Sequence, residues 1–100
     1  MAKRTDSNHA DIRLAFRSRG YSWVDTHEVG KGFPDAVVAR YGVNVLIEVK
    51  DGEKPPSKRK LTDDEQDFHA RFQGWVEIVE NEADVDRVCT AIRLAKLNHA

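Results

Sequence analysis

Two short runs of β-branched residues, which flank Tyr41-Gly42, constrain the fold of this chain more than any other feature. Residues 36–40 and 43–50 are rich in valine, a composition typical of strands. Tyr41-Gly42 fits a two-residue turn between them, so we expect an antiparallel hairpin. In such a hairpin the numbers of opposed residues add up to 83, and a turn changed by one residue would break this register.

The rest of the chain shows further helical and strand patterns around this hairpin. Residues 7–19 have hydrophobic side chains at helical spacing, and Gly20 is a typical residue at a helix end. Thr62-Asp63-Asp64-Glu65 fits a capping box, and Asn81 is suited to cap a final helix. The other predicted elements are strands over 21–25 and 75–79, loops over 27–33 and 51–60, and a helix over 62–72. We therefore expect an α/β fold of order α-β-β-β-α-β-α, with a central mixed four-stranded sheet flanked by helices.

Length and composition fit one small domain. The chain has 100 residues, of which 1–6 are polar, so we expect a flexible N-terminus followed by a single domain over 7–100. Because no apolar run could span a membrane, no secretory signal is evident and Cys89 is the only cysteine, we expect a reducing, cytoplasmic setting.

The two parts of the chain differ in charge. Residues 1–60 carry 12 Lys/Arg and 8 Asp/Glu, whereas residues 61–100 carry 4 Lys/Arg and 9 Asp/Glu. The N-terminal part is therefore better suited to a phosphate backbone, although an unevenly charged surface is the alternative.

The hairpin register brings charged residues together at one end. Asp35 would face Glu48, with Cβ atoms about 4.5–5.5 Å apart. Strand alternation places Glu48 and Lys50 on one face and Val49 on the other. Two partly buried carboxylates this close repel each other unless a cation neutralises them or a proton is shared. Their oxygens suit Mg²⁺, whereas the alternative is a surface strand in which Lys50 pairs with either carboxylate.

Gly32-Phe33-Pro34-Asp35, followed by the hairpin and by Ile47-Glu48-Val49-Lys50, resembles the PD-(D/E)XK nuclease signature. The helix that ends at Gly20 and the later helix opened by Leu61-Thr62 extend the similarity to the small VRR-NUC group of phage and bacterial nucleases, which is related in fold to archaeal Holliday junction resolvases. The resemblance implies a restriction-endonuclease-like fold. It also implies hydrolysis of DNA phosphodiesters with Mg²⁺ or Mn²⁺, in a bacterial cell or a phage-infected host.

The resemblance also implies roles for individual residues. Asp35 and Glu48 would be metal ligands, Lys50 the catalytic lysine, and the Val49 carbonyl a further metal contact. Family members usually add a polar or acidic residue from the first helix, and three residues compete for that position. These candidates are His9, Asp11 and Asn8. A Gln near the site in the second helix would be either Gln66 or, in place of a purely capping role, Glu65.

Basic residues cluster in the loop that directly follows Lys50. We expect these residues to grip phosphates, although a solvated loop is the alternative. The loop cations are Lys54, Lys58, Arg59 and Lys60. Arg13, Arg17, Lys31 and an arm with Lys3 and Arg4 would extend this track. A two-fold homodimer would place two sites on symmetric strands and would enlarge a small core.

Structural roles are the preferred interpretation for most of the remaining histidine and aromatic side chains. The histidines at 9, 27, 69 and 99 do not form a recognisable zinc spacing; His69 is predicted to be a satisfied core residue, and His27 to lie in a loop that could approach the site. The aromatic residues predicted for the core are Phe16, Trp23, Phe68, Phe72 and Trp75.

The leading hypothesis for the function is an endonuclease that cuts branched DNA. The alternatives are a nicking or general duplex nuclease and a non-catalytic DNA-binding module that retains the fold.

Overall fold

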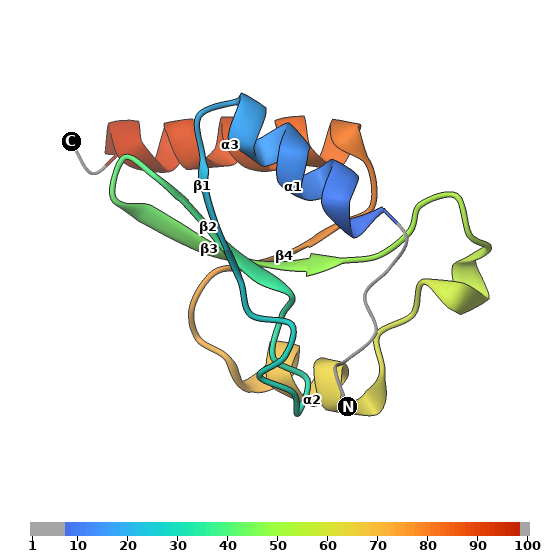
Figure 1. The fold of residues 1–100 in the computed structure, drawn as a ribbon. Helices are drawn as coiled ribbons and strands as arrows, with labels where there is room; N and C mark the ends of the chain where they lie inside the picture. The colour runs from blue at the N-terminus through green and yellow to red at the C-terminus, as the bar shows by residue number, and fades with distance from the viewer. Residues whose placement is uncertain (1–7, 99–100) are drawn as a thin grey trace.

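A mixed four-stranded sheet with helices on both faces forms the protein in the computed structural model, which describes residues 8–98 (Figure 1). The elements follow the order α1 (His9–Ser18), β1 (Ser22–Asp25), β2 (Ala36–Arg40), β3 (Val43–Val49), the 3₁₀ turn η1 (Pro56–Lys58), α2 (Asp63–Arg71), β4 (Val76–Val79) and α3 (Glu82–Asn98). This order confirms the predicted α/β class and mixed sheet. The predicted flexible segment 1–6 lies outside the described residues. No helix in the described part of the chain is long and apolar enough to cross a membrane.

The β2–β3 hairpin has the register that the sequence predicts. Its pairs run from Ala36 opposite Ile47 to Arg40 opposite Val43. The turn residues Tyr41 and Gly42 have φ values of 60° and 77°, as a two-residue hairpin turn with both central residues left-handed requires. β1 pairs antiparallel with β2, and β4 pairs parallel with β3, so the sheet order is β1-β2-β3-β4.

The hydrophobic core lies between the sheet and the helices α1 and α3, which pack over the same face (Figure 1). Strand residues that alternate along β3 point into this core, and fully buried helix residues meet them. The buried β3 residues are Val45, Ile47 and Val49, and the main helix contributions are Ile12, Phe16, Val85, Val88 and Ile92. The opposite face near the end of β3 is covered by α2 (Figure 1).

The C-terminal end of α2 differs from the sequence prediction. The helix ends at Arg71, because Phe72 already has extended backbone angles of −73° and 122°. Phe72 is 39% exposed and therefore is not a core residue, contrary to the prediction. Its ring instead stacks on Phe68 at a centroid distance of 5.0 Å. The chain bends at Gly74, where a Cβ would overlap the Phe72 ring, so the glycine leaves room for the aromatic side chain.

Candidate active site at the end of the hairpin

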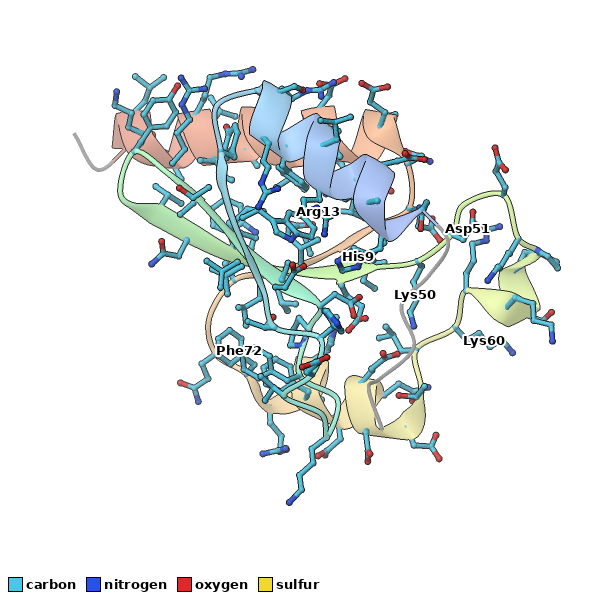
Figure 2. All side chains as sticks on the ribbon, in the orientation of Figure 1. His9, Arg13, Lys50, Asp51, Lys60 and Phe72 are labelled. Atoms are coloured by element: carbon cyan, nitrogen blue, oxygen red, sulfur yellow. The ribbon has the colours of Figure 1, made fainter. Side chains whose placement is uncertain are left out.

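Asp35, Glu48 and Lys50 lie where β2 begins and β3 ends, and all three are buried. Their exposed fractions are 6%, 1% and 8%. Since Val49 belongs to the core under α1 and α3, Glu48 and Lys50 project from the other face of the sheet. Figure 2 shows Lys50 extending from the end of β3 toward α2. The hairpin therefore delivers these charged side chains to the space between the sheet and α2.

Asp35 is fixed by the strand beside it. The regular ladder ends at Ala36, and the backbone N–H of Asp35 still donates to the Ile47 carbonyl at 2.9 Å. The Asp35 Oδ2 atom accepts a hydrogen bond of 2.8 Å from the backbone N–H of Val49. The Asp35 carboxyl group is close enough to Glu48 to raise the pKa of the Glu48 side chain. Asp35 and Glu48 thus meet at the hairpin end, as the register predicts.

Glu65 in the first turn of α2 completes this group. Its Oε1 atom accepts a hydrogen bond of 2.8 Å from Lys50 Nζ, and Glu65 is 5% exposed. The same oxygen accepts from the backbone N–H of Thr62, whose hydroxyl accepts from the Glu65 N–H, so the predicted capping box is present. Glu65 therefore serves the cap and the site together. The competing candidate, Gln66, is exposed and donates to the Leu61 carbonyl.

We call Asp35, Glu48, Glu65 and Lys50 the carboxylate–lysine cluster. It places three carboxyl groups and one amine in a buried environment. Burial raises the pKa of Glu48 to about 10, with further contributions from the hydrogen bond and charge of Asp35 and from the charge of Glu65, against a smaller opposing effect of Lys50. Burial beside two other carboxyl groups therefore disfavours the negatively charged form of Glu48 as long as no cation is bound.

His69 faces this cluster instead of the hydrophobic core. Its Nε2 atom lies 3.8 Å from Glu48 Oε1, and neither buried atom has a hydrogen-bond partner within the described chain. Burial lowers the pKa of His69, which favours the neutral ring. The prediction of a satisfied core histidine is therefore wrong, because α2 carries His69 over the end of β3.

The three candidates of the first helix have other surroundings. The His9 Nε2 atom lies 3.0 Å from Asp25 Oδ1. The Asn8 amide donates to the carbonyls of Lys50 and Glu80, both at 3.0 Å, and so fastens the start of α1 to the end of the sheet. Asp11 is exposed and lines a hollow of about 910 Å³, whose acidic rim would repel phosphate. The other acidic residues of this rim are Asp51, Glu53, Glu80 and Glu82.

The predicted DNA-contacting residues divide into outward and inward groups. Lys54, Lys58 and Lys60 are exposed on the loop between β3 and α2, where Figure 2 labels Lys60. Arg59 is turned inward and pairs with Glu80 at 3.2 Å. Arg13 lies 3.7 Å from Asp25 Oδ2. Lys31 and Arg17 are exposed, whereas Lys3 and Arg4 lie outside the described residues.

A group of possible metal ligands that the sequence did not reveal consists of His9, Asp25 and His27. The spacing of these residues carries no zinc pattern, since they meet only because α1 packs against the end of β1. Figure 2 shows His9 on the side of α1 that faces the sheet. Sequence reasoning could find this group only with the helix docking already known.

Comparison with known proteins yields no assignment. No protein-family model, curated protein or solved structure matches this chain. An α/β architecture by itself does not assign a function, because such folds carry many activities. The side chains gathered at the hairpin end are therefore the basis for a functional proposal.

Proposed function

We propose that this protein is a Mg²⁺-dependent DNA endonuclease with a restriction-endonuclease-like fold, which cuts branched DNA such as Holliday junctions. One observation carries the proposal: Asp35, Glu48 and Lys50 are buried together at the end of one hairpin. The resemblance of the same residues to the PD-(D/E)XK signature supports it. A buried surplus of carboxyl groups is unfavourable in a structural role, but it suits a site that binds a cation.

The donor set of the carboxylate–lysine cluster fits a hard divalent cation. The Glu48 Oε1 atom is buried without a hydrogen-bond partner within the described chain, so one carboxyl oxygen is available to a ligand. Asp35, Glu48 and the Val49 carbonyl would hold Mg²⁺ or Mn²⁺, for which oxygen ligands are preferred. When bound, such an ion polarises the phosphodiester and lowers the pKa of a water molecule.

The chain's own groups supply orientation and charge. Asp35 cannot swing freely, because the Val49 N–H holds its Oδ2 atom at 2.8 Å. Glu65 fixes the Lys50 ammonium at 2.8 Å. An ammonium held in this way would orient the attacking water or stabilise the charge that develops on the phosphate. The exposed lysines of the adjacent loop would bind the DNA backbone without reading its sequence.

A two-fold homodimer is part of the proposal. Two copies would present two sites to the symmetric strands of a junction. Large apolar side chains on α1 and α3 are exposed and would be covered in such a dimer. They are Leu14, Leu94 and Leu97, with exposed fractions of 67%, 56% and 69%.

Cleavage of labelled four-way junction, nicked, duplex and single-stranded DNA with Mg²⁺, Mn²⁺ or EDTA tests the proposal. We expect metal-dependent cleavage with a preference for the junction. Lys50→Ala should lower the rate at least about 100-fold, the magnitude typical of a lost charge-stabilising group. Lys96→Ala is the matched control, since Lys96 lies over the Tyr41 ring at the opposite end of the hairpin. Equal rates for the two folded variants would contradict the assignment of Lys50.

A non-catalytic DNA-binding module is the second candidate. It is favoured by the observation that His9 bonds to Asp25 and Asn8 to backbone carbonyls, so neither supports the metal residues directly. Junction binding by fluorescence anisotropy, without cleavage in Mg²⁺ or Mn²⁺, would establish this alternative. Cleavage that the Lys50→Ala variant loses would exclude it.

A further inference from the structure

His9, Asp25 and His27 form a second group of ligand-type side chains, which we call the histidine cluster. His9 begins α1, Asp25 ends β1, and His27 lies in the turn that follows. Each residue offers one ligand atom, and these three atoms lie within 4.8 Å of one another. The histidine cluster shares no residue with the carboxylate–lysine cluster, and His9 belongs to α1 and Asp25 to β1, whereas Glu65 and His69 come from α2.

Both histidines carry a buried ring nitrogen without a partner. Within the described residues, the Nδ1 atoms of His9 and His27 make no hydrogen bond. The two rings lie 5.5 Å apart between centroids, at an interplanar angle of 75°. Buried polar atoms in native proteins are nearly always satisfied, by protein groups, water or an ion. Each of the two rings grouped with the Asp25 carboxylate therefore has a nitrogen for which a bound ligand would supply the missing partner.

Neighbouring side chains fix the position of the Asp25 carboxyl group. The Trp23 Nε1 atom donates to Asp25 Oδ1 at 2.8 Å, and His9 Nε2 lies 3.0 Å from the same oxygen. Arg13 lies 3.7 Å from the second carboxyl oxygen. Metal ligands are oriented by neighbouring donors of this kind.

We propose that the histidine cluster binds a transition-metal ion of the Zn²⁺ class. Two imidazoles and one carboxylate suit Zn²⁺ or Co²⁺, whereas Mg²⁺ and Ca²⁺ favour oxygen ligands. With three protein ligands, the ion keeps an open position for water.

Binding requires only a small closure of the cluster. With metal–ligand distances of about 2.0–2.2 Å, ligand atoms in a tetrahedral site lie roughly 3.4 Å apart. His27 is half-buried in a turn, so its ring is the member able to make this movement. The ion would then join the start of α1 to the loop that leads to Asp35. Thr26 lies in that loop and donates its backbone N–H to the Asp35 carbonyl at 2.7 Å.

Co²⁺ quenching of tryptophan fluorescence tests the site without any activity assay. In tag-free Trp75→Phe protein, Trp23 is the remaining tryptophan, and its ring centroid lies 5.5 Å from that of His9. We expect Co²⁺ to quench Trp23 saturably with one equivalent bound, and Zn²⁺ to reverse the quenching by competition. Zn²⁺ should also raise the thermal midpoint, because it binds the folded chain preferentially.

Three variants decide the assignment. His27→Ala should raise the Co²⁺ concentration for half-quenching more than about tenfold, since one of three ligands is lost. Glu28→Ala removes an exposed neighbouring charge but no ligand and should change it less than about twofold. Glu48→Gln should leave quenching intact. The proposal is overturned if Co²⁺ does not quench saturably below about 1 mM, if His27→Ala binds as the parent does, or if Glu48→Gln abolishes quenching.

Discussion

Gly32 is the point at which the loop before Asp35 lies directly on α2, so a methyl group there should disturb the site from outside. A Cβ on Gly32 would lie 2.8 Å from the Glu65 backbone nitrogen and would overlap the Asp64 carbonyl. Both are backbone atoms of the first turn of α2 and cannot rotate away. Relief of these contacts requires the loop and the helix to separate by roughly 1 Å.

Gly30 is a matched control for Gly32→Ala. Both glycines have a φ of 81° in the same loop, but a Cβ on Gly30 would meet no atom within 4 Å. The left-handed backbone should cost either alanine about 1–2 kcal/mol, and the loss of chain entropy in the unfolded state affects both equally. Overpacking adds about 1–3 kcal/mol at Gly32 alone. The difference between the variants therefore reports the contact with α2.

Urea denaturation of the parent, Gly30→Ala and Gly32→Ala gives the three free energies of unfolding. We expect Gly32→Ala to be less stable than Gly30→Ala by about 1–3 kcal/mol, equivalent to roughly 4–20 °C in the thermal midpoint. Amide hydrogen exchange should locate the additional opening in α2. Equal losses of stability, or exchange confined to the loop, would refute the packing of this loop on α2.

Two further predictions concern the dual role of Glu65 and the burial of Tyr21. Glu65→Gln preserves the capping box, so stability should change by less than about 1 kcal/mol, while junction cleavage falls more than tenfold because Lys50 loses its charged partner. Thr62→Ala should show the reverse, with about 1 kcal/mol of stability lost and cleavage retained. Burial, then a hydrogen bond with the Cys89 side chain of α3, raises the pKa of Tyr21 from 10 to about 12. The protonated Tyr21 hydroxyl therefore stabilises the fold below pH 10, and about 3 kcal/mol of this stability is lost as the pH rises toward 12. The urea midpoint of the parent should fall steeply between pH 9 and pH 12. An equally steep fall in Tyr21→Phe would contradict this origin.

The hairpin could be predicted from sequence because its information is local. Two β-branched runs and the Tyr41-Gly42 turn determine the register, and the register determines that Asp35 meets Glu48. The capping residues of α2 and α3 are equally local, since the side chains of Thr62 and Asn81 accept hydrogen bonds from backbone N–H groups three residues later. These short-range rules define most of the elements and half of the candidate site.

The remaining half depends on how helices dock, which no spacing rule contains. Glu65 reaches Lys50 only because α2 lies across the end of β3. His9 bonds to Asp25 because α1 packs against β1, and their separation of 16 positions along the chain matches no metal-ligand spacing. Phe72 was misplaced for a similar reason: helical periodicity continued in the sequence after the backbone had already become extended.

The burial of the carboxylate–lysine cluster connects fold to function. A domain of this size has a stability of only about 5–15 kcal/mol, and removing several charged groups from water opposes it. Apolar side chains at these positions would fill the same space at no electrostatic cost. Instead the hairpin, the Gly32 contact and the cap of α2 all hold Glu48 and Lys50 in place. An arrangement that the fold maintains against its own stability is expected at a functional site, and the Glu48 oxygen that lacks a hydrogen-bond partner within the described residues is where the proposed cation would bind.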